Sequence, residues 1–192
     1  WNSRSGRQKI HYSQQLAGGK PGMHSLAIAM HPFMQLHGLL EERALDVMLE
    51  VKDKNLSAIK CANLTRAGLP RKNLTEEWAR YKYLVLERSP GVYSAIRQLL
   101  KSENPTAEAF YGLLEDALAC RLEPGKARNA AEHVWGYVSR NAPARESARI
   151  LKDLELLGND LTPLPRIKRK LLTLAADNNE DYLLHSLYFY IN

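Results

Sequence analysis

The chain has 192 residues, with 27 Lys and Arg against 21 Asp and Glu, so its formal net charge is +6. Hydrophobic residues make up 45% and charged residues 25%, which excludes a collagen-like, low-complexity or wholly disordered chain. No run approaches the roughly 18 apolar residues of a membrane span, so we predict a soluble protein with no membrane partner. The N-terminus shows no signal-peptide pattern, and Cys61 and Cys120 form no CxxC motif, which favours a reduced, cytoplasmic protein.

Residues 1–31 are predicted to form a basic, flexible N-terminal tail. The first 40 residues contain no Asp or Glu, and they include the breaker cluster Gly18-Gly19-Lys20-Pro21-Gly22. Such a stretch does not readily bury a core, and it fits either vector-derived residues or a basic arm for nucleic acid. His24, His31 and His37 lie close together here, but their spacings share no helix face, so we expect no metal site.

Residues 32–192 are predicted to form a single helical domain. Apolar residues recur at helical spacing in segments near 35–53, 56–66, 75–88, 92–101, 106–123, 127–141, 150–157, 164–174 and 182–191. Thr106 and Thr75 are suited to capping helix N-termini, and Pro and Gly residues separate several of the segments. Because no convincing alternating strand pattern occurs, the predicted fold class is all-α, a compact multi-helix bundle of about seven to eight helices.

The segment 127–141 carries a polar stripe beside its apolar one. Asn129, His133 and Tyr137 recur at helical spacing, with Gly136 and Arg140 on the same side. One interpretation is a ligand-contacting face, and the other is a helix buried on two sides with its polar groups hydrogen-bonded inside. No nucleotide-binding, metalloprotease or hydrolase motif accompanies the stripe, so the sequence assigns no catalytic residue, metal or cofactor.

The densest basic run is Arg166-Ile167-Lys168-Arg169-Lys170. Arg166, Arg169 and Lys170 share one helical face, which suits phosphate contacts but is also typical of a solvated surface. Lys168 lies at the margin of the apolar face, where it must snorkel, pair with an acid or contact an anion. Elsewhere, basic residues interleaved with aromatic rings resemble the composition of RNA-binding surfaces, and they include Arg80, Lys82 and Arg140.

Five short motifs follow one another in an informative order. They are Arg80-Tyr81-Lys82, Ser89-Pro90 with Tyr93, Asn129 to Tyr137, Pro163 to Lys168, and Tyr182-Leu183 with Tyr188-Phe189. Over about residues 56–190 this order resembles the YbgA-type bacterial and archaeal domain of unknown function. The resemblance implies an RNA-binding appendage of the kind fused to thiouracil-desulfidase-like domains, which would present thiolated tRNA to the catalytic domain. This chain lacks the cysteines of such a catalytic domain, so the resemblance implies only the binding half.

The sequence therefore predicts a non-catalytic nucleic-acid-binding domain without a cofactor. Its expected ligand is structured RNA such as tRNA, and its expected protein partner is a tRNA-modifying or desulfidase-like enzyme. The predicted contacts are Arg80, Lys82, Arg140, Arg166, Lys168, Arg169 and Lys170. One alternative is a small-molecule-binding domain or small enzyme with a pocket formed by His133, Tyr137 and Lys168, together with Asn129. The other is a protein-interaction scaffold, and the oligomeric state stays open.

Overall fold

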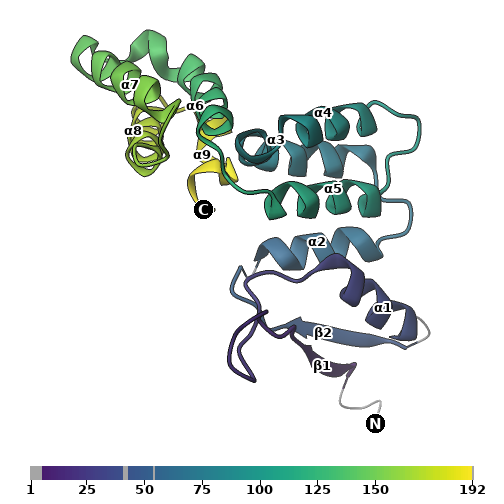
Figure 1. The fold of residues 1–192 in the computed structure, drawn as a ribbon. Coiled ribbons are helices and arrows are strands. Elements are labelled where there is room, and N and C mark those ends of the chain that lie inside the picture. The colour runs from purple at the N-terminus through teal and green to yellow at the C-terminus, as the bar shows by residue number, and fades with distance from the viewer. Residues whose placement is uncertain (1–5, 41–42, 54, 192) are drawn as a thin grey trace. The chain divides into compact units, whose positions relative to one another are not determined.

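The computed structural model describes residues 6–40, 43–53 and 55–191, and this part of the chain is mostly helical (Figure 1). The all-α prediction is thereby confirmed, with a small two-stranded sheet added to it. The chain divides into two units: the first comprises residues 1–69 and 106–112, and the second comprises residues 70–105 and 113–192. Within the described ranges, no helix is long and apolar enough to cross a membrane.

The first unit contains a parallel pair of strands. β1 (Gln8–Tyr12) pairs with β2 (Leu45–Leu49), and α1 (Met30–Leu40) connects them in the chain (Figure 1). α2 (Asn55–Thr65) follows and packs against α1. Between β1 and α1, Gln15 and His24 form an isolated antiparallel bridge, and Ile28 is fully buried. The Ile28 amide donates a 2.8 Å hydrogen bond to the hydroxyl oxygen of Ser57 on α2.

Two features of this unit differ from the sequence analysis. The predicted helix over 35–53 is wrong, because α1 ends at Leu40 and residues 45–49 form β2. Leu45, Val47 and Leu49 are separated by Asp46 and by the apolar Met48, so the strand period is weak in the sequence, and the leucines before them extend the helical pattern. Residues 8–12 form β1 inside the segment whose composition favoured a tail, because pairing with β2 satisfies the backbone without a large apolar surface.

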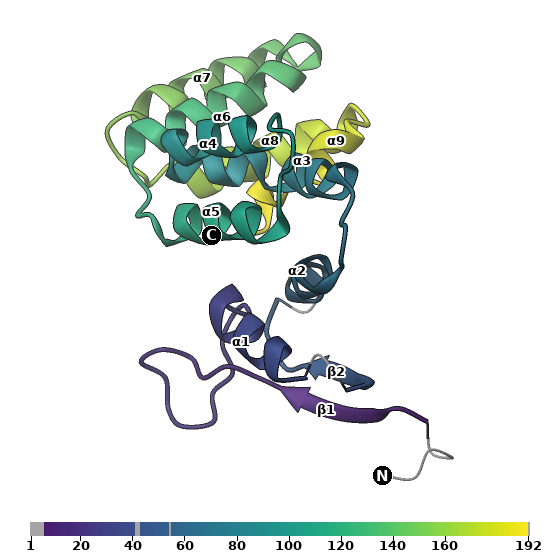
Figure 2. The same cartoon turned by 90° about the vertical axis from the view of Figure 1, so that its right-hand side faces the viewer.

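The second unit is helical in its described part (Figure 2). Its helices are α3 (Arg71–Arg88), α4 (Pro90–Leu99), α6 (Pro124–Val138), α7 (Ala144–Leu157), α8 (Leu164–Asp177) and α9 (Asp181–Leu184), with short 3₁₀ turns η2 (Ser139–Asn141) and η3 (Leu187–Phe189). α5 (Ala107–Ala119) begins in the first unit and ends in the second. α3 packs against α6 and η3, and α6 packs against α7 and α8.

Local signals set some helix boundaries as the sequence predicted, but the predicted cap at Thr75 is wrong. α3 begins four residues earlier at Arg71, because Pro70 starts the helix, and the Thr75 hydroxyl donates to the Arg71 carbonyl inside it. The hydroxyl of Thr106 accepts a 3.2 Å hydrogen bond from the Ala109 amide at the start of α5. The hydroxyl of Ser89 accepts from the Val92 amide, and Pro90 occupies the first turn of α4. The core of the second unit then forms from the apolar stripes of α3, α6, α7 and α8, which bury residues such as Val134.

Candidate active site

Three titratable side chains from separate parts of the first unit meet at one end of the sheet. His11 Nδ1 lies 2.5 Å from Glu50 Oε1, and His24 Nδ1 lies 3.7 Å from Glu50 Oε2. His24 Nδ1 is also 2.9 Å from the carbonyl oxygen of Glu50. The side chains are 61% exposed for His11, 37% for His24 and 40% for Glu50, so solvent or a ligand can reach them. These residues form the His11–Glu50–His24 cluster.

The parallel pairing of β1 and β2 explains why this cluster forms. Tyr12 is paired with Leu49, so Glu50 comes directly after the last paired residue of β2. The Glu50 amide donates a 2.8 Å hydrogen bond to the Tyr12 carbonyl, which holds the carboxylate beside β1. The carboxyl ends of parallel strands meet at one edge, which is where α/β proteins place ligand-binding groups. The bridge between Gln15 and His24 brings the second imidazole to the same edge.

The electrostatics of the cluster keep Glu50 charged. The hydrogen bond with His11 lowers the pKa of Glu50 below its ordinary value, and burial opposes this effect. The charges of His11 and His24 lower the pKa of Glu50 further. A carboxylate bound to Nδ1 of an imidazole fixes the tautomer of the ring and leaves Nε2 able to accept or donate a proton. The arrangement therefore suits general acid–base chemistry.

Imidazole nitrogens and carboxylate oxygens are also the donor types that divalent metal ions bind. Among the residues described, however, no group of three or more His, Cys, Asp and Glu side chains is arranged to hold a metal ion. In the cluster, His11 and Glu50 are hydrogen-bonded to each other instead. A cavity of about 530 Å³ in the same unit is lined by α1, β2 and α2, with His37 and Cys61 among its polar groups, and the cluster does not line it.

The pocket residues predicted on α6 lie in the second unit, on the polar side of that helix. Asn129 is half-buried and His133 is exposed. Tyr137 is 42% exposed, and its hydroxyl accepts a 2.9 Å hydrogen bond from the hydroxyl of Tyr83. The ring of Tyr137 stacks on that of Tyr182, with centroids 5.7 Å apart. The contacts of Tyr137 are thus aromatic, and a shared pocket with Lys168 stays a prediction.

Lys168 has its own partner inside the second unit. Its Nζ lies 2.8 Å from Glu87 Oε1 and 4.4 Å from the ring centroid of Tyr188. The two charged side chains are 8% and 0% exposed. Burial raises the pKa of Glu87 and lowers the pKa of Lys168, while the charge of each partner opposes the shift of the other. Lys168 therefore uses its charge to bind a carboxylate in the core.

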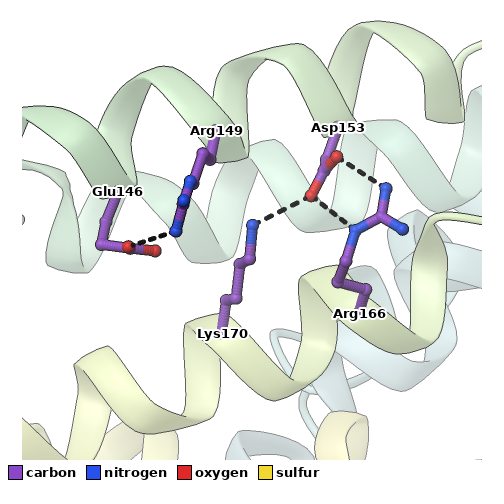
Figure 3. Close-up of polar contacts among 5 residues, drawn as sticks. All are labelled: Glu146, Arg149, Asp153, Arg166 and Lys170. Carbon is purple, nitrogen blue, oxygen red and sulfur yellow. Dashed lines mark hydrogen bonds and ion pairs between the residues drawn. The ribbon is translucent and has the colours of Figure 1, made fainter.

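Two more residues of the basic run bind an acid on the neighbouring helix. Figure 3 shows Asp153 of α7 pointing between Arg166 and Lys170 of α8. The guanidinium of Arg166 binds both oxygens of Asp153, at 2.7 and 2.9 Å, and Lys170 Nζ lies 3.2 Å from Oδ2. The hydrogen bond from Arg166 lowers the pKa of Asp153 and raises the pKa of Arg166. These cations hold α7 and α8 together.

The remaining predicted cations have different surroundings. Arg80 Nη1 forms a 2.7 Å ion pair with Glu77 on the same helix. Arg140 and Arg169 are exposed, and Lys82 is half-buried beside tyrosine rings. Contact between these residues and a nucleic acid stays a prediction.

His11 and Glu50 did not emerge from the sequence analysis. In the sequence, His24 stands out only beside His31 and His37, with which it shares no helix face. The signal that was available is a position near the end of a short strand, since His11 lies one residue before the end of β1 and Glu50 lies one residue after the end of β2. Such residues meet when the two strands are parallel. The pairing of two distant strands depends on the tertiary structure, so a local sequence pattern does not predict it.

The second unit identifies the family. The chain belongs to the family described as protein of unknown function DUF1722, whose model matches residues 82–191. This match confirms the prediction that the chain contains a domain of unknown function. A protein of Clostridium perfringens (strain 13 / Type A) named UV DNA damage endonuclease is 35% identical over 122 residues, which are 62% of this chain and 29% of that protein. The chain thus spans less than a third of that relative, and no solved structure matches it.

The name of this relative corrects the function expected from the sequence. The sequence predicted a non-catalytic RNA-binding domain that is accessory to a tRNA-modifying or desulfidase activity. The likeness to a protein named as an endonuclease contradicts this prediction, because an endonuclease is an enzyme. The expectation rested on the family resemblance and on basic residues, above all the basic run. Three of the four cations in that run bind acids within the fold: Arg166, Lys168 and Lys170. The alternative of a small enzyme agrees better with the comparison.

Proposed function

We propose that this chain is part of an enzyme that cleaves damaged DNA, and that the His11–Glu50–His24 cluster supplies acid–base groups for the cleavage. The observation that carries the proposal is the 2.5 Å contact between His11 and Glu50 at the end of a parallel strand pair. The name of the Clostridium perfringens relative supports the choice of substrate and reaction. Since the chain spans 29% of that relative, the proposal concerns the groups that this chain contributes.

The chemistry of DNA cleavage makes definite demands on such a cluster. Hydrolysis of a phosphodiester adds water across a P–O bond, so one group accepts a proton from the water and another protonates the leaving oxygen. Two imidazoles on opposite oxygens of one carboxylate can divide these roles, with Glu50 stabilising whichever ring is protonated. The exposure of all three side chains leaves room for a DNA backbone beside them.

The test is cleavage of UV-irradiated supercoiled plasmid by the purified chain, followed as conversion to nicked circles. Glu50→Gln and His11→Ala should each lower the nicking rate by about 100-fold or more, the usual contribution of a general acid or base. His31→Ala is the matched control, because His31 is an exposed imidazole of the same unit that contacts Gln35 on its own helix.

Each reaction is run with Mn²⁺ and with EDTA, since the donor types in the cluster also suit a divalent ion. Unirradiated plasmid shows whether damage is required. The absence of nicking by the unchanged chain, or nicking that persists in Glu50→Gln, would overturn the proposal.

Two expectations from the sequence enter this proposal unchanged. A YbgA-type assignment within the matched family is supported by the order of the five motifs, four of which lie wholly within residues 82–191. A cytoplasmic location is supported by Cys61 and Cys120, which are both free thiols.

A further inference from the structure

Lys82 of α3 lies among tyrosine rings that belong to several helices of the second unit. Its Nζ is 4.7 Å from the ring centroid of Tyr83 and 5.5 Å from that of Tyr182 on α9. Electrostatic interactions with Tyr137 on α6 and Tyr93 on α4 contribute to raising the pKa of Lys82. These five residues form the Tyr–Lys cluster, and the match to the family of unknown function includes all of them.

The inner part of the Tyr–Lys cluster is structural. Tyr83 is 2% exposed, belongs to the core of the second unit, and meets Tyr137, Tyr182 and Tyr188 edge to face. The outer part reaches solvent, since Tyr137 is 42% exposed and stacks on Tyr182 at an interplanar angle of 28°. The hydrogen bond from the Tyr83 hydroxyl holds the Tyr137 ring in place. A fixed aromatic surface is therefore available to a flat ligand.

The charge of Lys82 is not matched by an acid in the described structure. Other lysines of this unit bind carboxylates, as Lys168 binds Glu87 and Lys126 binds Glu123, whereas the described contacts of Lys82 are with tyrosines. Desolvation lowers the pKa of Lys82, but its interactions with Tyr182 and the neighbouring hydroxyls outweigh this, so the net shift is upward. A half-buried ammonium without a carboxylate partner is suited to an anionic ligand.

We propose that the Tyr–Lys cluster binds a nucleotide, with the phosphate on Lys82 and the base stacked on the exposed part of Tyr137. A cation for the backbone and an aromatic ring for the base are the two elements with which proteins hold single nucleic-acid strands. A nucleotide within a single DNA strand and a free deoxynucleotide share this chemistry. The choice of DNA rests on the proposed function. His133, exposed one turn before Tyr137 on α6, borders the same surface.

The experiment measures binding of a fluorescein-labelled oligothymidylate to the full chain by anisotropy, at several salt concentrations. Lys82→Met should weaken binding about tenfold and make the dependence of log K on log salt shallower by about 0.7, the share of one phosphate contact on a single strand. Tyr137→Ala should weaken binding by about tenfold, whereas Tyr137→Phe, which keeps the ring, should retain most of it.

Lys126→Met is the matched control, because it removes the same charge from a lysine of the same unit that already has a carboxylate partner. Circular dichroism confirms that each variant is folded. Equal losses in Lys126→Met and Lys82→Met, or unchanged binding in Lys82→Met, would overturn the proposal. Tighter binding of oligouridylate than of oligothymidylate would overturn the assignment to DNA.

Competition with thymidine monophosphate distinguishes the two sources of the nucleotide. Displacement of the labelled strand at equal nucleotide concentration identifies a free nucleotide as the ligand, and displacement only at large excess identifies the strand. Glu50→Gln tests the nicking rate of the proposed function, whereas Lys82→Met and Tyr137→Ala test nucleotide binding in the second unit. Loss of nicking and loss of nucleotide binding are thus separate results, and each tests its own site.

Discussion

The two units of this protein use their charged side chains in opposite ways. In the first unit, His11, Glu50 and His24 are partly exposed, and they contact one another at the end of a strand pair. In the second unit, Lys168 binds Glu87 inside the core. A charged side chain that is buried against its partner cannot contact a ligand, whereas exposed side chains that are oriented by one another can. The position of a charge in the fold is therefore more informative about function than its place in a basic run.

The largest effect that sharpens this contrast is expected at the buried pair. Lys168→Met removes the ammonium and leaves the Glu87 carboxylate buried without compensation, since Glu87 is 0% exposed. We expect a loss of about 3–5 kcal/mol in the free energy of unfolding. Urea unfolding followed by circular dichroism measures this loss, and a loss below about 1 kcal/mol would contradict a structural role for the pair.

The pH dependence of Lys168→Met supplies an independent check. Burial raises the pKa of Glu87 above its ordinary value of 4.5, and the variant lacks the lysine that opposes this shift. A carboxyl whose pKa is raised by folding favours the folded state when protonated, so its penalty is absent below pH 4.5 and grows as the pH rises through the raised value. The variant should thus approach the unchanged protein at low pH. Adding Glu87→Leu should recover most of the stability at neutral pH.

A smaller loss is expected at the surface between α7 and α8. Asp153→Asn removes the charge that binds Arg166 and Lys170, and we expect a loss of about 1.5–3 kcal/mol. Because folding lowers the pKa of Asp153, its contribution is present above its ordinary value of 3.8 and disappears as the pH falls through the lowered value. The difference between variant and unchanged protein should therefore shrink below pH 3.8.

Glu146→Gln is the control for Asp153→Asn, because Glu146 pairs with Arg149 on the same helix (Figure 3) and its carboxylate is 36% exposed, against 10% for Asp153. An exposed pair of this kind contributes about 0.2–1 kcal/mol. Equal losses in Glu146→Gln and Asp153→Asn would show that Asp153 is an ordinary surface charge.

What could be predicted from the sequence was decided by distance along the chain. The Thr106 cap and the break at Ser89-Pro90 depend on neighbours within a few residues, and the structure confirms both. The margin position of Lys168 predicted that it needs a partner, yet Glu87 lies 81 residues away, and no local pattern connects the two. The pairing of β1 with β2 and the contact of His11 with Glu50 are equally non-local. Most helices could therefore be predicted from the sequence, whereas the candidate site could not.

The smallest of these effects concerns the segment that carries His24 to the sheet. Ser57, fully buried on α2, accepts a hydrogen bond from the Ile28 amide and donates one to Asp53 Oδ2, both at 2.8 Å. Ser57→Ala leaves the buried Ile28 amide without this partner, and we expect a loss of about 1–2 kcal/mol. Hydrogen exchange at Ile28 should accelerate accordingly, while amides of the second-unit core, such as Val134, exchange as before. Unchanged exchange at Ile28 would mean that the segment before α1 is held by other contacts. Accelerated exchange accompanied by weaker nicking would connect the anchoring of this segment to the geometry of the His11–Glu50–His24 cluster.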